Sequence, residues 1–244
     1  MDRKTRIAMV CSLAALVCAC GGGGGGSGAD ASATAPVGGL SPTAPTSPSP
    51  SPAATLGQSS NIVAWGDSLT PAFALNLQVL MTDRGVANDG FLGATSTAIA
   101  NNAVSDTDHR NWINVFWYGQ NNEDDPDTIK ADIARSVAHL APGNTHFIVL
   151  GVVNKSDGKE KKGTGTYNKI VKLNAELAAL YPDNFIDIRA WLVAHYNPND
   201  AGDVQDHDDD QVPRSLRYDE IHLRNEGSLL VAQRVREFIA AKGW

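Results

Sequence analysis

Short apolar runs alternate with helical patterns over residues 61–244, and this alternation constrains the fold more than any other feature. The runs that predict strands cover residues 62–65, 85–88, 113–118, 146–153 and 185–188. Strands that are separated by helices form a parallel sheet with both faces covered, and right-handed crossovers leave few topologies. We therefore expect one three-layer α/β/α domain, built on a central parallel sheet of about five strands.

Helical periodicity marks the segments between these runs. Apolar residues recur at helical spacing after the first run and predict a helix that starts near Pro71, with Gly85 as its C-cap. Further helices are predicted for residues 94–103 and around 129–140, 170–180 and 231–239.

The first strand ends in Gly66-Asp67-Ser68, directly before a predicted helix. A serine at this turn lies at the carboxyl edge of the sheet, where open α/β folds bind their ligands. Backbone N–H groups and the positive dipole end of the helix point to the same place. The pattern indicates a nucleophile at Ser68, although serine is also an ordinary residue at the start of a helix.

A second chemical signal lies just before the last helix, where Asp219 precedes His222 by three residues. At this spacing the carboxylate reaches the imidazole Nδ1, while Nε2 faces outward and can remove a proton from a serine hydroxyl. The alternative is a pair of surface-turn residues.

Four blocks in chain order resemble those of the SGNH (GDSL) hydrolase family, and they span essentially the whole domain, residues 61–244. The blocks are Gly66-Asp67-Ser68-Leu69, Gly93, Gly119-x-Asn121-Asn122 and Asp219-x-x-His222. The resemblance implies the flavodoxin-like SGNH fold, and a carboxylester hydrolase that needs neither a metal nor a cofactor.

The same resemblance implies a role for each matching residue. Ser68 would be the nucleophile, His222 the general base and then acid, and Asp219 the residue that orients the imidazole. The oxyanion hole would comprise the backbone N–H groups of Ser68 and Gly93 and the side-chain amide of Asn121.

Some parts of the match leave alternatives open. Asn121 also fits a turn after a strand, and Gly90 competes with Gly93 for the oxyanion position. The family usually has Asp where this chain has Asn122, a residue that we expect to support local structure rather than to react.

The N-terminus resembles a bacterial lipoprotein signal. Residues 1–19 combine a basic start with a short apolar stretch, and Ala19 precedes Cys20. The resemblance implies cleavage before Cys20, lipidation of that residue and a stable anchor in the cell envelope. The glycine that follows, Gly21, suggests by analogy the outer membrane. An ordinary secretory signal is the alternative.

Residues 20–60 predict a disordered linker, because residues 21–60 consist of Gly, Ser, Pro, Ala and Thr with very few other residues. All three cysteines lie at positions 11, 18 and 20, so the domain itself has no disulfide or thiolate site. The chain has a formal net charge of −7, which argues against a nucleic-acid partner.

Two polar stretches allow more than one interpretation. Residues 206–210, Asp-His-Asp-Asp-Asp, would form either a solvated acidic loop or a cation site. The stretch lacks the residue spacing of a calcium loop, which favours the acidic loop. Residues 155–163 would form a polar crossover loop or a mobile lid that meets acidic headgroups or sugars.

These observations favour an esterase or acylhydrolase that acts on short acyl esters, such as acetylated carbohydrates, because no long apolar lid is visible. The alternatives are a phospholipase or lipase, an acyltransferase on envelope lipids or glycans, and a non-catalytic surface binding module. The sequence leaves the oligomeric state open.

Overall fold

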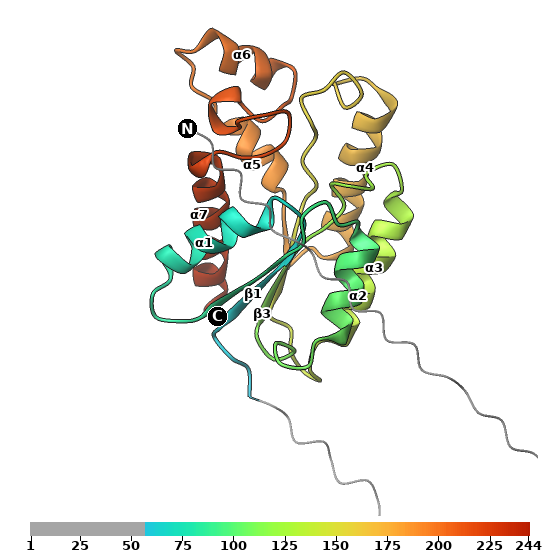
Figure 1. The fold of residues 1–244 in the computed structure, drawn as a ribbon, viewed down its shortest axis with the longest axis vertical. Coiled ribbons are helices and arrows are strands. Elements are labelled where there is room, and N and C mark those ends of the chain that lie inside the picture. The colour runs from blue at the N-terminus through green and yellow to red at the C-terminus, as the bar shows by residue number, and fades with distance from the viewer. Residues whose placement is uncertain (1–56) are drawn as a thin grey trace, which may run out of the picture. The chain divides into compact units, whose positions relative to one another are not determined.

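The computed structural model describes residues 57–244, which form a parallel sheet between two layers of helices (Figure 1). The strands pair in the order β2-β1-β3-β4-β5, all parallel, and the fold expected from the sequence is confirmed. Their bounds are Ile62–Gly66 (β1), Val86–Gly90 (β2), Ile113–Trp117 (β3), Phe147–Leu150 (β4) and Phe185–Ile186 (β5).

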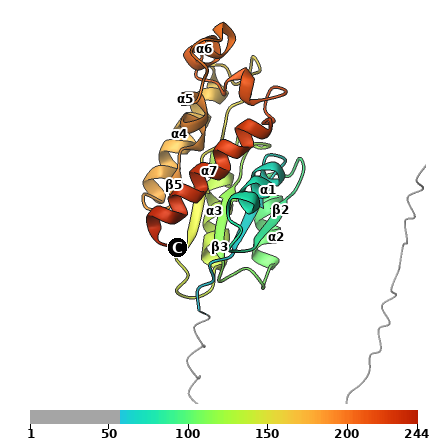
Figure 2. The ribbon, with the colours of Figure 1, turned by 90° about the vertical axis from the view of Figure 1, so that its left-hand side faces the viewer.

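Alternate residues of β1 point into two separate cores. Ile62 and Ala64 pack with α1 (Thr70–Leu80), α5 (Ile188–Ala194) and α7 (Asn225–Lys242). Val63 and Trp65 pack with the opposite layer, which comprises α2 (Ser96–Ser105), α3 (Pro126–His139) and α4 (Gly165–Leu180). Figure 1 shows the two layers on either side of the sheet, and Figure 2 shows α7 crossing in front of it. All five residues of β1 are buried, as a central strand with both faces covered requires.

The chain changes direction between β1 and β3, which are neighbours in the sheet. After β1 the chain enters α1 on one face, whereas after β3 it enters α3 on the other. The two connections diverge and leave a crevice at the carboxyl ends of these strands, which is where doubly wound folds bind ligands. Ser68 and Asn121 follow the two strands, so both lie at this crevice.

Several local predictions are wrong. Gly85 does not cap the first helix, because α1 ends at Leu80 and its cap is Met81. The strand predicted at 185–188 ends at Ile186, because Asp187 accepts a hydrogen bond from the N–H of Ala190 (2.9 Å) and begins α5. Helix α6 (Ala201–Asp208) and the 3-10 helix η1 (Arg214–Leu216) are not predicted from the sequence.

The predicted signal segment, residues 1–19, and the predicted lipidation site, Cys20, lie outside the described residues, as does most of the predicted linker. Its last four residues, 57–60, are described and contact the domain: Ser59 N–H donates to the carbonyl of Asn111 (2.9 Å). No helix within residues 57–244 has the length and apolar character to cross a membrane.

Candidate active site

The turn after β1 holds Ser68 in place through tight packing and one buried carboxylate. Gly66 leaves no space for a side chain, since a Cβ there would lie 2.0 Å from Thr70 Oγ1 and 2.8 Å from the Trp117 carbonyl oxygen. Asp67 accepts a hydrogen bond from the N–H of Leu69 (3.0 Å), which fixes the turn into α1. Ser68 is therefore presented at the carboxyl edge of the sheet.

The turn before α7 brings His222 to this serine. His222 Nε2 lies 2.9 Å from Ser68 Oγ, and His222 Nδ1 lies 2.8 Å from Asp219 Oδ2. The other carboxylate oxygen of Asp219 accepts the N–H groups of Ile221 (2.9 Å) and His222 (2.7 Å). The structure thus places the three predicted residues in one hydrogen-bonded chain, across a sequence separation of 154 residues.

Two carboxylates at the site experience opposite environments. Partial burial favours the neutral acid of Asp219, but hydrogen bonds from Ile221 and His222 outweigh it and lower the pKa of Asp219. Asp219 therefore stays ionised beside the imidazole. Burial raises the pKa of Asp67 to about 6, against the hydrogen bond from Leu69 that lowers it.

The predicted oxyanion residues line the same pocket as Ser68 and His222, a hollow of about 420 Å³. Gly93 has a φ of +71°, a conformation that favours glycine. Asn121 Nδ2 lies 3.0 Å from the carbonyl of Ala94, so one amide proton is donated and the second is left for a ligand. Gly90, the competitor, is the last residue of β2 and donates its N–H to Asn88 Oδ1 (3.2 Å). Since Gly90 does not line the pocket, the geometry favours Gly93.

Asn122 supports the loop that carries Gly93. Its Oδ1 accepts the N–H of Ser96 (2.9 Å), and its Nδ2 donates to Ser96 Oγ (2.9 Å). Ser96 Oγ in turn donates to Asp132 Oδ2 (2.8 Å). The amide therefore joins the start of α2 to the turn after β3, the structural role expected for this departure from the family pattern.

Several other residues of the pocket are not among the predicted site residues, although Lys155 belongs to the polar stretch 155–163. They are Leu92, Gln120, Lys155, Tyr218 and Ile221. Tyr218 stacks on the imidazole of His222, with ring centroids 5.6 Å apart and an interplanar angle of 11°. Leu92 is 79% exposed. Its position between Gly90 and Gly93, the two glycines that compete for the oxyanion position, is the signal that could have indicated a rim residue.

Lys155 reaches the pocket from the loop after β4 and is held by two carboxylates. Its Nζ lies 2.7 Å from Glu123 Oε1 and 3.1 Å from Glu160 Oε1. Burial raises the pKa of Glu160 to about 7, although hydrogen bonds from Lys155 oppose this shift. A single-sequence pattern carries no signal for this long-range pairing.

The acidic stretch 206–210 is not a solvated loop throughout, which corrects the prediction. Asp206 lies in α6, is buried and accepts hydrogen bonds from Arg214 Nη2 (2.8 Å) and Arg217 Nη2 (3.1 Å). Asp210 pairs with Arg189 and Tyr167. Within residues 57–244, no three acidic, histidine or cysteine side chains converge as metal ligands would.

The chain is similar to known proteins both in sequence and in structure. No family model matches the chain. A tail spike protein of Salmonella phage epsilon15 is 30% identical over 149 residues, which are 56% of this chain and 14% of that protein. The chain thus spans a small part of that relative's length.

Solved structures give broader matches. A GDSL-like lipase from Bacteroides thetaiotaomicron superimposes with a TM-score of 0.58 at 17% identity, covering 75% of this chain and 88% of that one. An acetyl xylan esterase gives 0.57 at 16% identity, covering 72% and 98%. The C-terminal catalytic domain of peptidoglycan O-acetyltransferase A from Streptococcus pneumoniae gives 0.52 at 17%, covering 76% and 95%.

These neighbours define a class by fold. The chain has the three-layer α/β/α fold of the GDSL (SGNH) lipolytic proteins and acylhydrolases, which confirms the resemblance at the level of the fold.

Proposed function

We propose that this protein is a serine carboxylester hydrolase of the GDSL type that works through an acyl-serine intermediate. One observation carries the proposal: Ser68 Oγ, His222 and Asp219 form a continuous hydrogen-bonded chain at the carboxyl edge of the sheet. This constellation makes a serine hydroxyl nucleophilic, because the imidazole takes its proton and the carboxylate stabilises the imidazolium that results.

In the proposed reaction, Ser68 Oγ attacks the ester carbonyl carbon while His222 Nε2 takes the hydroxyl proton. The carbonyl oxygen becomes an oxyanion that accepts hydrogen bonds from the N–H groups of Ser68 and Gly93 and from the amide of Asn121. Each such donor contributes about 3 kcal/mol to the stabilisation of the transition state. The imidazolium then gives its proton to the leaving alcohol. Water next attacks the acyl-serine while His222 takes a proton from it, and that proton passes to Ser68 Oγ as the carboxylic acid leaves.

The pocket supports short acyl groups, such as the acetyl groups of acetylated carbohydrates. Its volume is about 420 Å³, and polar side chains (Gln120, Asn121 and Lys155) line it beside apolar ones (Leu92, Tyr218 and Ile221). An acyltransferase would use the same intermediate but pass the acyl group to an alcohol instead of water. A phospholipase or lipase would need a longer apolar channel.

We also propose that the mature protein is anchored in the bacterial cell envelope, at the outer membrane, through lipid on Cys20. The basis is the lipoprotein-like pattern of residues 1–20. Radiolabelled palmitate should be incorporated into the wild-type protein and not into Cys20→Ala, and equal labelling of both would contradict the anchor.

The enzymatic proposal is tested with a series of p-nitrophenyl esters from acetate to palmitate. Ser68→Ala should abolish turnover without changing the thermal unfolding curve, while the matched control Ser105→Ala, on the exposed side of α2, should retain it. Activity that peaks at long chains would favour a lipase. Wild-type turnover by Ser68→Ala would refute the assignment.

A further inference from the structure

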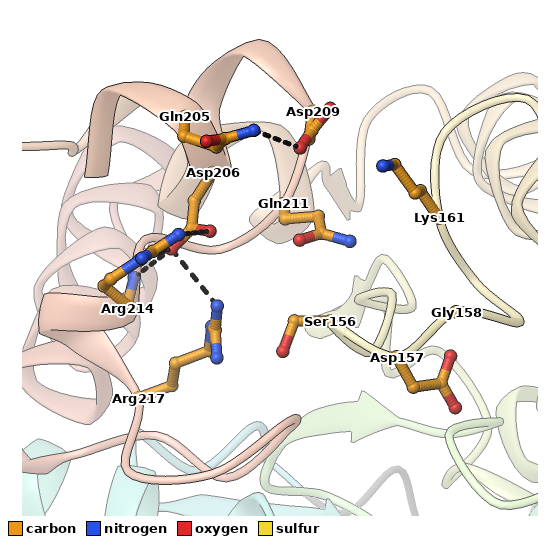
Figure 3. A pocket seen from close by; sticks show the side chains of 10 residues that line it. All are labelled: Ser156, Asp157, Gly158, Lys161, Gln205, Asp206, Asp209, Gln211, Arg214 and Arg217. Carbon is orange, nitrogen blue, oxygen red and sulfur yellow. Dashed lines mark hydrogen bonds and ion pairs between the residues drawn. The ribbon is translucent and has the colours of Figure 1, made fainter. Parts of the chain in front are cut away.

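A second cleft, of about 450 Å³, lies beside the active site and plays no part in the proposed chemistry (Figure 3). We call it the lateral cleft. One wall is the loop after β4, and the other is formed by the end of α6 and the segment that leads through η1 to Arg217. Its lining residues are Ser156, Asp157, Gly158, Lys161, Gln205, Asp206, Asp209, Gln211, Arg214 and Arg217. The volume is within the range of small-molecule binding sites.

The lateral cleft adjoins the active site along two stretches of chain. Arg217 borders both the cleft and a shallow hollow whose other residues are 219–222, and His222 then borders the active-site pocket. On the opposite wall, Lys155 lines the active-site pocket and Ser156 lines the cleft. A chain-like molecule can therefore occupy the cleft while one of its units lies at Ser68.

Gln211 carries the strongest sign of a ligand. The residue is only 7% exposed, and its side chain takes part in no hydrogen bond within residues 57–244. Its side-chain amide atoms are not fully buried, so they are open to the cleft. Figure 3 shows this amide facing the open centre of the cleft, between Ser156 and Lys161. An amide that no other protein group occupies can both donate to and accept from a ligand, as a sugar hydroxyl does.

The charges of the lateral cleft balance. The lining contains three acidic residues (Asp157, Asp206 and Asp209) and three basic ones (Lys161, Arg214 and Arg217). The two arginines are occupied, because both donate to Asp206 on the same wall (Figure 3). An anionic ligand would need free guanidinium groups, so the balance favours an uncharged ligand with many hydroxyl groups.

We propose that the lateral cleft binds a neutral oligosaccharide chain whose ester-bearing unit reaches Ser68. The inference deepens the proposed function, on which it rests for the fate of the ester. Binding of the oligosaccharide requires no hydrolysis, so the two proposals can fail separately.

Gly158 offers a way to fill the cleft without straining the fold. A Cβ at Gly158 would meet no atom within 4 Å, and the same holds for Gly165 at the start of α4, which does not line the cleft. Gly158→Trp therefore places a large side chain at the cleft, and Gly165→Trp is its matched control. Gln211→Leu removes the amide but keeps a side chain of similar size.

The test measures binding of unmodified xylohexaose, cellohexaose and chitohexaose to the full chain carrying Ser68→Ala, by isothermal titration calorimetry. At least one hexasaccharide should bind, and Gly158→Trp and Gln211→Leu should each weaken it at least tenfold, whereas Gly165→Trp should not. Because the Gln211 amide has no partner within residues 57–244, Gln211→Leu should also leave the unfolding midpoint unchanged, which a purely structural role would not allow.

Three results would overturn the inference: no binding of any hexasaccharide, binding that neither cleft variant weakens, or binding of inorganic phosphate in place of the sugars. Sugar binding in a protein whose wild-type form hydrolyses no ester would instead retain the lateral cleft as a glycan site and refute only the enzymatic proposal.

Discussion

Replacement of Asp219 by asparagine isolates the contribution of one charge at the site. Asp219 accepts three hydrogen bonds, and the carbonyl oxygen of the introduced amide can keep the two from the N–H groups of Ile221 and His222. Only the contact with His222 Nδ1 changes, because an amide NH₂ would now face that nitrogen. The imidazole would then accept at Nδ1 and carry its proton on Nε2, where it cannot take the proton of Ser68.

The expected loss of activity follows from the interactions that Asp219→Asn removes. A hydrogen bond to a charged group contributes about 1.5–3 kcal/mol, and the carboxylate also stabilises the imidazolium formed in the transition state. The same replacement in a serine protease triad lowers kcat about 10⁴-fold. The Asp219 side chain is 44% exposed, so water screens part of the interaction. We expect a loss of about 10³-fold in kcat/KM, or about 4 kcal/mol.

The assay is hydrolysis of p-nitrophenyl acetate at pH 8, with thermal unfolding as a check on the fold. Glu220→Gln is the matched control, since Glu220 is the adjacent exposed carboxylate and its side chain has no hydrogen bond or ion pair within residues 57–244. An Asp219→Asn protein with kcat/KM within about threefold of the wild type would refute the reasoning.

Three further perturbations test separate parts of the site. Asn121→Ala should lower kcat by about 10²–10³-fold with little change in KM, because one donor to the oxyanion is lost. Steady-state kinetics checks this prediction, and a rise in KM with kcat unchanged would contradict it. Asp67 has a pKa raised to about 6 by burial, so the folded state binds more protons than the unfolded state between about pH 4 and 6. The contribution of Asp67 to stability should fall as the pH rises across that window, by up to about 3 kcal/mol, and be constant above it, while Glu160, whose pKa is raised to about 7, adds its own decline up to that pH. Asp67→Asn should remove the share of this slope that Asp67 contributes, measured in urea titrations, and an unchanged slope would assign it to other groups. Gly66→Ala should destabilise the fold by about 2–3 kcal/mol in the same assay, since its Cβ would overlap Thr70 and Trp117; a loss below about 0.5 kcal/mol would contradict the packing described.

The central fold could be predicted because its signals are local. Each of β1, β3 and β4 is a short apolar run, and α1 and α7 show apolar residues at helical spacing. The turn that presents Ser68 was also readable, because the residues that force it, Gly66 and Asp67, are its immediate neighbours.

The parts that were missed depend on contacts between distant residues. Helix α6 is short and polar, and its buried Asp206 is stabilised by Arg214 and Arg217 rather than by an apolar face. The pairing of Lys155 with Glu123 likewise joins residues that are 32 positions apart. The lateral cleft is formed by two polar stretches whose proximity no local pattern encodes.

The central claim is that Ser68 is a nucleophile activated by His222. The most direct measurement is labelling of the full chain with a fluorophosphonate probe, followed by mass spectrometry of the peptides. The account predicts a single adduct on Ser68, absent from Ser68→Ala and formed far more slowly by His222→Ala. A wild-type protein that stays unlabelled, or one that carries the adduct on another residue, would contradict it.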